Sequence, residues 1–523
     1  MVELKSLAHE RKVAWLYGLA LFALLMFLTG REPPWGDARI MYDVAGSITH
    51  GKVSIGIAWP PMSHAGADGA IYSQYALLPS LAHLPGIWLR NAMEPTAIHR
   101  VITSHVAPAF GAALTVVMFL LAAQTFYSRR ASRWAAAMVA FGSLLFVYAR
   151  YPMSEALQAG VVMGMLRSAI VLHGKPGRTN GIWFGAWCGI VVNTKSVLLL
   201  SVLALALALA WLLRHDRPAL RQSVVGLFIG ALPFVILFGW YNMVRWGAPW
   251  STGYGETLGM MNEHPLSGLW GLVVSPGKGI LWFSPAIIVA VIGVYRLVAQ
   301  RNALGLLIVA TVVPPVLFYS RFLSWSGDYA WGPRYLVFAM APMYLGIAHV
   351  LHASTMDTVT RVAGWCVRGV FALSVAVQLL GASVFWDHWI RISRKANIEW
   401  LGAPNRSGAA IAEAGRGHCD SCFEDMHGHQ WLPPLSPLYG QLWLVRSLIT
   451  AAPWQQAQAN APWRRYTALD IASPAPEFAQ IRFDWWFLAT GWSTALRWSL
   501  LWLVLAAGGL WRGRRYERQA AAG

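Results

Sequence analysis

The chain has 523 residues, of which 56% are hydrophobic and only 12% are charged. Because a soluble globular protein carries about 25% charged residues, this composition excludes a soluble protein and indicates one that lies within a lipid bilayer. The formal net charge is +18. Nothing in the sequence resembles a nucleic-acid-binding module, so we expect no nucleic-acid partner.

Twelve apolar segments are the predicted membrane spans: residues 13–29, 100–124, 133–149, 153–173, 181–194, 196–213, 221–240, 279–297, 303–320, 334–352, 363–385 and 488–511. A straight helical span needs about 20 apolar residues, so the short neighbours 181–194 and 196–213 are either two spans or one long bent helix. Segment 71–90 is also apolar, but Pro79 and Pro85 interrupt it. We expect this segment to be re-entrant or to lie at the membrane surface.

Basic residues predict the orientation of these spans. With the N-terminus in the cytoplasm, the cytoplasmic loops are short and carry Lys or Arg, as in "YSRRASR", "HGKPGRTN" and "RHDRPALRQ". Lys and Arg gather in the short loops on the cytoplasmic side of a membrane. We therefore expect both termini to be cytoplasmic. Placing the protein in a bacterial inner membrane, with the periplasm outside, assumes a Gram-negative-like host. Most of the positive charge then reflects the orientation of the spans in the membrane.

The fold class that follows is an α-helical polytopic membrane protein with about 12 transmembrane helices. Residues 1–385 form the transmembrane domain, which includes a first periplasmic loop over residues 30–99. Residues 386–487 form a small C-terminal periplasmic domain, and residues 488–523 form the final helix and a cytoplasmic tail. The aromatic and polar stretches, such as "WSGDYAWGPRY", all fall on the periplasmic face. Loops on a rigid scaffold commonly carry function, so we expect the chemistry on that face.

The first periplasmic loop contains a predicted amphipathic helix. After Asp37, the apolar residues between Ile40 and Ile48 follow helical spacing, and polar residues fill the opposite face. Such a helix is typical of the membrane surface. Asp37 either caps this helix through its side chain or takes part in function, and the two roles are compatible.

The order of these features resembles the GT-C glycosyltransferase superfamily, whose members include the protein O-mannosyltransferases and the lipid A aminoarabinose transferase. The resemblance is closest to a bacterial branch of lipid-carrier-dependent glycosyltransferases. It covers residues 36 to about 445. The motifs that carry it are "GDARIMYDVAGSITHGKVSI", "DGAIYSQYALLPSLAHLPG", "WGAPWSTGYG", "SPGKGILWFSP", "WSGDYAWGPRYL" and "LPPLSPLYGQLWLV".

This resemblance implies a cell-envelope hexosyl- or pentosyltransferase with a periplasmic active site. The donor would be a polyprenyl-phosphate-linked sugar, and the acceptor a glycolipid, a polysaccharide or a protein. Asp37 matches the first-loop acid of the superfamily, which is expected to act as general base or to hold the acceptor hydroxyl. Many relatives carry two adjacent acids here, but the second position is Ala38 in this chain. We therefore assign no metal ligands, although Mg²⁺ or Mn²⁺ stays an open alternative.

Four cations near the periplasmic face are candidates for binding the donor phosphate: Lys278, Arg334, Lys195 and Arg245. Arg suits bidentate phosphate binding, and Lys acts as a point charge beside a departing phosphate. The alternative is that each side chain extends to the membrane headgroups without touching substrate.

Glu155 stands just inside the start of a predicted span, where a carboxylate is costly unless it is paired or lies in a wet cavity. It is either a second catalytic acid or a structural partner of Arg150. The candidates for binding the acceptor or the sugar are Tyr42, Asp68, Tyr72, Asp328 and Trp331. Turn formation by "DG" and the interfacial aromatic belt are the alternative explanations for these residues.

Cys419 and Cys422 lie in "HCDSCFEDMHGH" in the predicted periplasmic domain. The two cysteines form a local disulfide, bind a metal together with neighbouring histidines, or do neither.

Two other function classes remain open at this point. A transporter or flippase of lipid-linked sugars often shows internal symmetry and broken helices at mid-membrane, and the sequence shows no evident repeat. A non-catalytic envelope protein that binds glycolipid would not need Asp37 or the surrounding cations.

Overall fold

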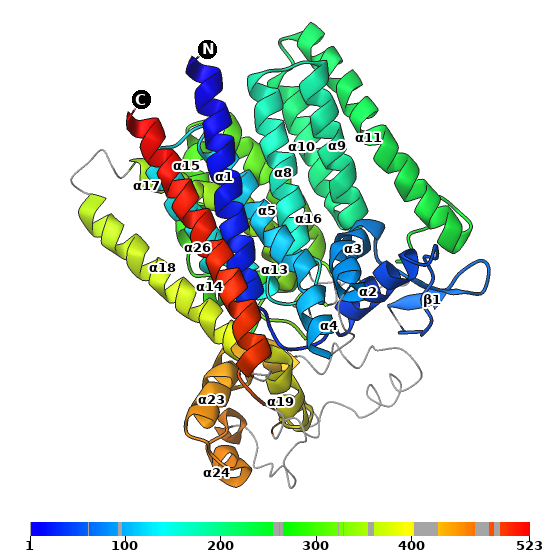
Figure 1. Ribbon diagram of the computed structural model, residues 1–523, viewed down its shortest axis with the longest axis vertical. Helices are drawn as coiled ribbons and strands as arrows, with labels where there is room; N and C mark the ends of the chain where they lie inside the picture. Colours follow the sequence, from blue (N-terminus) through cyan, green and yellow to red (C-terminus); the bar gives the residue numbers. More distant parts are fainter. Residues whose placement is uncertain are drawn as a thin grey trace.

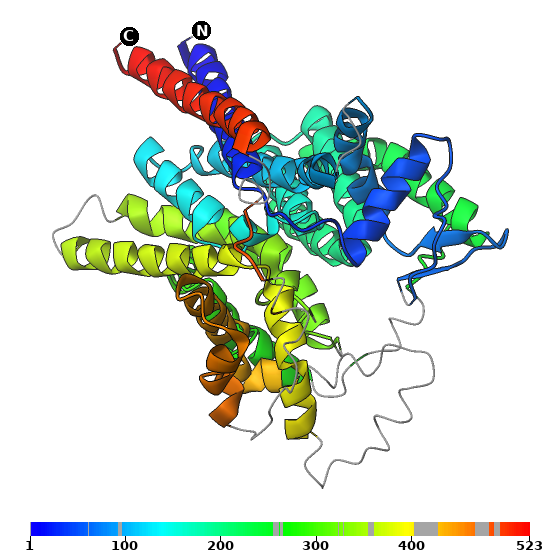
Figure 2. The ribbon, with the colours of Figure 1, turned by 60° about the horizontal axis from the view of Figure 1, so that its bottom comes forward.

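A computed structural model describes residues 2–60, 62–92, 97–254, 261, 265–322, 324–327, 329–353, 360–401, 427–465, 478, 481–485 and 492–522. The molecule is a bundle of helices (Figure 1). The first helix, α1 (Val2–Phe27), and the last, α26 (Trp492–Ala522), lie side by side, and both chain ends emerge at the same end of the bundle (Figures 1 and 2). This arrangement agrees with the prediction that the two termini share one side of the membrane.

Every predicted span contains at least one helix. The helices between α1 and α19 in the bundle are α4 (Ala97–Ser104), α5 (Val106–Ala123), α6 (Arg129–Phe141), α7 (Leu145–Tyr148), α8 (Glu155–Gly174), α9 (Arg178–Thr194), α10 (Leu199–Leu212), α11 (Arg217–Trp246), α13 (Pro265–Val274), α14 (Ile280–Phe283), α15 (Ile287–Ala299), α16 (Ala303–Ser320), α17 (Val337–Ala353) and α18 (Thr360–Ser383). The segments 181–194 and 196–213 are two separate helices, which meet at Lys195 and a short 3-10 turn, η1 (Ser196–Leu198).

Six stretches of the described chain are long and apolar enough to cross a membrane: Arg100–Ala123, Glu155–Gly174, Arg217–Trp246, Ala303–Ser320, Arg334–Ala353 and Trp365–Ser383. Two apolar helices, Ser196–Leu212 and Ile287–Ala299, are shorter. The chain is therefore a multi-pass membrane protein. The number of about 12 spans stays a prediction.

Glycines allow α9 and α11 to approach closely. A Cβ atom at Gly185 would lie 2.0 Å from the carbonyl oxygen of Leu227, and one at Gly230 would lie 1.9 Å from that of Ile182. Small residues at the contact between two helices are typical of membrane proteins. The other face of α11 exposes large apolar side chains such as Phe228 and Ile236, as expected where a helix meets lipid. Lys195 directly follows the end of α9, and Arg245 lies in the last turn of α11.

The first loop and the C-terminal segment gather at the end of the bundle opposite the termini (Figure 1). The first loop forms α2 (Asp37–Ile48), a hairpin of β1 (Ser63–Ala65) and β2 (Ile71–Ser73), and α3 (Leu77–Asn91). The two strands are antiparallel, with His64 opposite Tyr72. The prediction of a helix after Asp37 is confirmed.

The apolar face of α2 is covered by protein, whereas the sequence pattern predicts that it faces the membrane surface; where the helix lies relative to the membrane stays a prediction. Ile40, Met41 and Val44 are buried in a cluster with Ile55 and Tyr75. The hairpin and α3 supply enough apolar surface to cover this face with protein. Segment 71–90, predicted to be re-entrant or interfacial, is the second strand followed by α3.

The described elements of the C-terminal segment are helices, joined by turns and by the non-helical residues 481–485. Its elements are α19 (Trp386–Leu401), α22 (His427–Trp431), η3 (Pro433–Leu435), α23 (Pro437–Ile449), α24 (Trp454–Ala459) and η4 (Pro462–Arg465). Trp389, Trp443 and Trp463 pack together, with ring centroids 5.5 to 5.9 Å apart. They belong to the same apolar core as the bundle. Cys419 and Cys422 lie outside the described residues, and the boundaries 386 and 487 stay predictions.

Candidate functional site

A pocket with about 370 Å³ of space, including its open mouth, lies where the first loop meets the ends of several bundle helices. Its lining residues are Asp37, Met41, Tyr75, Ala76, Pro79, Ser154, Glu155, Thr194, Lys195, Tyr254, Arg334 and Tyr335. Four of the residues singled out in the sequence, Asp37, Glu155, Lys195 and Arg334, therefore share one pocket. They come from α2, the start of α8, the end of α9 and the turn before α17.

Asp37 and Arg334 form an ion pair inside this pocket. The Oδ2 atom of Asp37 lies 3.2 Å from Nη1 of Arg334, and the two side chains are 23% and 13% exposed. Gly36 precedes Asp37 with φ of +54°, a conformation that favours glycine, and no side-chain hydrogen bond caps α2 within the described residues. Asp37 is therefore the first residue of the helix, and its carboxylate is directed to Arg334 instead of to the helix backbone.

Lys195 carries the second cation of the pocket. Its backbone is extended, with φ of −156° and ψ of 114°, because it joins the end of α9 to η1. Its Nζ lies 6.0 Å from the ring centroid of Tyr75 and 5.8 Å from that of Tyr254. Aromatic faces attract a cation at such distances. The two rings thus hold the ammonium group at the pocket.

Tyr75 and Tyr254 are pocket residues that the sequence reasoning missed as individual candidates. Burial, together with the nearby Asp37 carboxylate, raises the pKa of Tyr75 well above its usual value. It therefore stays a neutral hydroxyl that can donate to Asp37. Its position inside the quoted motif "DGAIYSQYALLPSLAHLPG" was the available signal.

Glu155 begins α8 and is only 8% exposed. Its Oε2 atom is buried and has no hydrogen-bond partner among the described residues. It interacts electrostatically with Arg334, Asp37 and Lys195. The carboxylate therefore belongs to the charged group of the pocket.

The alternative partner of Glu155, Arg150, is occupied elsewhere. Its guanidinium donates to the main-chain carbonyls of Leu28, Ala382 and Asp484. The Ala382 bond is 2.7 Å long. These bonds tie the end of α1, the end of α18 and the segment 481–485 together.

Lys278 and Arg245, both predicted to contact phosphate, are not among the described residues that line the pocket. Lys278 is fully buried, and its Nζ donates to the carbonyl of Ala330 over 2.7 Å. Arg245 is 2% exposed and donates to the carbonyl oxygens of Ser73 and, over 3.1 Å, of Tyr75. Lys278 thus holds the segment before Arg334, and Arg245 holds the segment that contains Tyr75.

The described acceptor candidates also lie away from the pocket lining. Tyr42 is 3% exposed, and its hydroxyl lies 3.4 Å from Oγ1 of Thr103. Trp331 is fully buried, with its ring edge-on to that of Phe283 at 4.9 Å.

Asp68 and Tyr72 close the tip of the hairpin. The Asp68 carboxylate accepts from the amide of Ala70 over 3.0 Å and from the hydroxyl of Tyr72 over 2.8 Å. These two bonds lower the pKa of Asp68. This is the turn role that "DG" indicated. Asp328 lies outside the described residues.

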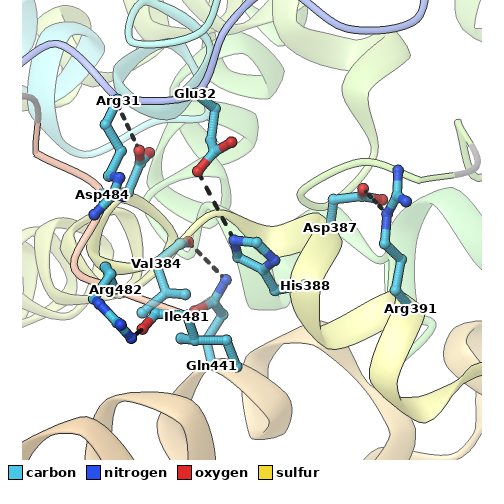
Figure 3. Close-up of polar contacts among 10 residues, drawn as sticks. All are labelled: Arg31, Glu32, Val384, Asp387, His388, Arg391, Gln441, Ile481, Arg482 and Asp484. Atoms are coloured by element: carbon cyan, nitrogen blue, oxygen red, sulfur yellow. Dashed lines mark hydrogen bonds and ion pairs between the residues drawn. The ribbon is translucent and has the colours of Figure 1, made fainter. Parts of the chain in front are cut away.

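A second polar cluster connects the segment before Asp37 to α19 and to residues 481–485 (Figure 3). The amide of Arg31 donates to Oδ1 of Asp484 over 2.8 Å, and Glu32 lies 3.9 Å from Nε2 of His388. Burial raises the pKa values of Glu32 and Asp484, and the charge of Asp484 adds to the effect at Glu32. We call this cluster of Arg31, Glu32, His388 and Asp484 the clasp. It holds the segment of the chain that positions Asp37.

Asp387 and Arg391 add an ion pair to the clasp. The Nε atom of Arg391 lies 2.5 Å from Oδ2 of Asp387 (Figure 3), and its guanidinium carbon lies 5.0 Å from the ring centroid of Trp35. Trp35 stands two residues before Asp37. In the part of the chain that the structure describes, no three His, Cys, Asp or Glu side chains converge as metal ligands.

No protein-family model and no curated protein matches this chain. Solved structures do match. ArnT from Cupriavidus metallidurans bound to undecaprenyl phosphate is 13% identical, with a TM-score of 0.46, over 88% of this chain and 85% of that one. The Archaeoglobus fulgidus oligosaccharyltransferase in its apo form is 12% identical, with a TM-score of 0.46, over 77% of this chain and 59% of that one.

The same archaeal enzyme in complex with Zn and sulfate is 13% identical, with a TM-score of 0.48, over 76% of this chain and 56% of that one. This chain therefore spans less than two thirds of the archaeal enzyme. The solved structures to which it is similar are those of GT-C glycosyltransferases, the superfamily that the sequence motifs resemble.

Proposed function

We propose that this protein transfers a sugar from a polyprenyl-phosphate donor to an acceptor hydroxyl at the periplasmic face of a bacterial inner membrane. The observation that carries the proposal is the pocket in which Asp37 lies 3.2 Å from Arg334, with Lys195 on the same lining. A base beside two cations is what sugar transfer from a phosphate requires.

Arg334 and Lys195 bind the donor phosphate in this account. The Arg334 fork can donate two hydrogen bonds to phosphate oxygens, and Lys195 supplies a second charge. Met41, Ala76 and Pro79 form an apolar part of the same lining, against which the first carbons of the lipid chain can lie. Undecaprenyl phosphate, which the Cupriavidus ArnT binds, is the first carrier to test.

Asp37 acts as the base. It removes the proton from the acceptor hydroxyl as the acceptor oxygen bonds to the anomeric carbon of the sugar. The bond between that carbon and the phosphate oxygen breaks, and the polyprenyl phosphate leaves with the electron pair. Arg334 and Lys195 stabilise the negative charge that develops on the phosphate. The proton on Asp37 then passes to solvent, which resets the site.

Tyr75 and Glu155 complete the site. Tyr75 orients the Asp37 carboxylate through its hydroxyl, and Glu155 is a second acid in the pocket. A Mg²⁺ or Mn²⁺ ion beside the phosphate remains part of the proposal to test. The acceptor is a glycolipid, a polysaccharide or a protein.

Lipids that copurify with the protein test this function. The wild type, purified in detergent and examined by mass spectrometry, should carry a polyprenyl phosphate or its glycosylated form. Arg334→Gln with Lys195→Gln should lose it, whereas Lys52→Gln with Arg446→Gln, which removes the same number of charges outside the pocket, should keep it. The absence of such a lipid from the wild type, or its equal retention by both double variants, would contradict the proposed phosphate site.

A further inference from the structure

The buried carboxylate of Glu155 has one oxygen, Oε2, without a hydrogen-bond donor in the part of the chain that the structure describes. It lines the pocket, it is 8% exposed, and Oε2 has no partner among the described residues. A buried acceptor that stays unsatisfied is costly, and the cost is larger when the group is charged. A ligand group that donates a hydrogen bond would remove this cost when the pocket is filled.

The position of Glu155 identifies which part of the ligand it meets. It interacts electrostatically with Arg334 and Lys195, the two cations assigned to the donor phosphate. The sugar is joined to that phosphate through one anomeric oxygen, so the sugar ring must lie next to the phosphate. Asp37, which lines the same pocket as Glu155, is assigned to the acceptor hydroxyl. The sugar is thus the part of the donor that lies within reach of Glu155.

Resting on the proposed function, we propose that Glu155 recognises the donor sugar by accepting a hydrogen bond from one of its hydroxyl or ammonium groups. The site then selects neutral or amino sugars. It rejects sugars that carry a carboxylate, because a third carboxylate beside Glu155 and Asp37 would be repelled in a partly dehydrated pocket. Glu155 is therefore a specificity-determining residue, distinct from the base.

Binding of defined donor lipids tests this inference. The probes are a short-chain polyprenyl phosphate without sugar and the same lipid carrying a glucosyl, a 2-amino-2-deoxyglucosyl or a glucuronosyl group. Dissociation constants are measured for the wild type, Glu155→Gln, Glu155→Ala and the control Glu10→Gln, which makes the same change in a carboxylate that lies 3.5 Å from Arg129, outside the pocket lining. Thermal unfolding of each variant establishes whether it is folded. If Glu155→Ala does not fold, Glu155→Gln alone is compared with the wild type.

We expect the wild type to bind the glucosyl or amino-sugar lipid about 10-fold or more tightly than the bare lipid, and the glucuronosyl lipid more weakly than either. Glu155→Ala should bind the bare and the sugar-bearing lipids about equally. Glu155→Gln should lose about 10-fold in affinity if the partner is a hydroxyl, and about 100-fold if it is an ammonium group. Glu10→Gln should discriminate among the lipids as the wild type does.

Two different failures can be told apart. If the wild type binds the bare lipid but gains nothing from the sugar, prefers the glucuronosyl lipid, or discriminates as well without Glu155, the inference is overturned and the phosphate site stands. If the wild type binds neither the bare lipid nor any sugar-bearing form, the proposed function itself is overturned, and the role of Glu155 with it.

Discussion

Arg245 donates a hydrogen bond from Nη1 to the main-chain carbonyl of Tyr75, 3.1 Å away, and Tyr75 lines the same pocket as Asp37. Arg245 is itself fixed, because its Nη2 donates to Oδ1 of Asn242 over 2.7 Å and its guanidinium stacks on the ring of Tyr241 at 3.8 Å. The end of α11 thus positions the residue that orients the proposed base.

Removal of the Tyr75 hydroxyl should weaken catalysis without weakening donor binding. Tyr75→Phe keeps the ring beside Lys195 but removes the hydroxyl that the proposed function directs to Asp37, and a hydrogen bond to a charged group is worth about 1.5–3 kcal/mol. We expect kcat to fall about 10-fold or more and the acid limb of the pH–rate profile to move to higher pH. A carboxylate that has lost a donor holds its proton more tightly. Stopped assays across a range of pH measure both effects.

Tyr72→Phe is the matched control in the same hairpin. Its hydroxyl donates to Asp68 and not to a pocket residue, so the pH–rate profile should keep its position. A profile that moves equally in both variants would show that the hairpin as a whole, and not the Tyr75 hydroxyl, sets the protonation behaviour of the site.

Arg245→Lys should reduce kcat through Tyr75. A lysine ammonium cannot reproduce the planar fork that holds Ser73, Tyr75 and Asn242 at once. If Arg245 acts by positioning Tyr75, its effect on kcat and that of Tyr75→Phe will not add in the double variant. A double-mutant cycle on kcat measures this coupling. Strict additivity would mean that Arg245 supports the fold without acting through Tyr75.

The four charged residues of the pocket could be predicted from the sequence because each stands where an apolar segment meets a loop. Asp37, Glu155, Lys195 and Arg334 all occupy such positions, and an ionisable group there is costly unless it has a function. The same reasoning selected Lys278, whose Nζ instead donates to the carbonyl of Ala330. Sequence shows that a cation lies at the end of a span, but only tertiary packing decides whether it faces a pocket or a carbonyl.

Tyr75 could not be selected from the sequence for a related reason. Its place beside Asp37 depends on a hairpin that Arg245, 170 residues later in the chain, holds in position.

The apolar pattern of α2 predicted part of what the structure shows. It predicted the helix and its buried face, but no periodicity distinguishes a face covered by lipid from one covered by α3 and the hairpin.

Arg150 should be among the residues most important for stability. It is fully surrounded by protein, at 3% exposed, and satisfies the carbonyls of Leu28, Ala382 and Asp484. Arg150→Met would leave these carbonyls, and the buried Asp484 carboxylate, without their cation, at a cost of about 3–5 kcal/mol. Thermal unfolding in detergent measures the loss. Arg214→Met, at an exposed position, should change stability by no more than about 0.5 kcal/mol.

The clasp should make stability depend on pH through Glu32. Burial and Asp484 raise the pKa of Glu32 above its ordinary value of 4.5, while Arg31 and Arg391 oppose the shift and Asp387 adds to it. Because the folded-state pKa is the higher one, the contribution of Glu32 to stability is fully present below pH 4.5 and is lost as the pH rises through the raised value.

Glu32→Gln removes this titration, so the variant should be more stable than the wild type at neutral pH. The difference should shrink as the pH falls toward 4.5. Thermal unfolding from acid to neutral pH checks the sign. A variant that is less stable than the wild type at neutral pH would show that the ion pair with His388 outweighs the cost of burying the carboxylate.

The measurement that tests the central claim most directly compares sugar transfer and donor binding in Asp37→Asn. Purified protein is incubated with a glycosylated polyprenyl phosphate and a bacterial envelope fraction as acceptor, and the free polyprenyl phosphate released is quantified by mass spectrometry. Asn has nearly the shape of Asp but cannot take up the proton, so we expect release to fall about 10²-fold or more while donor binding is retained. Release at the wild-type rate by Asp37→Asn would contradict the assignment of this pocket as the site of transfer.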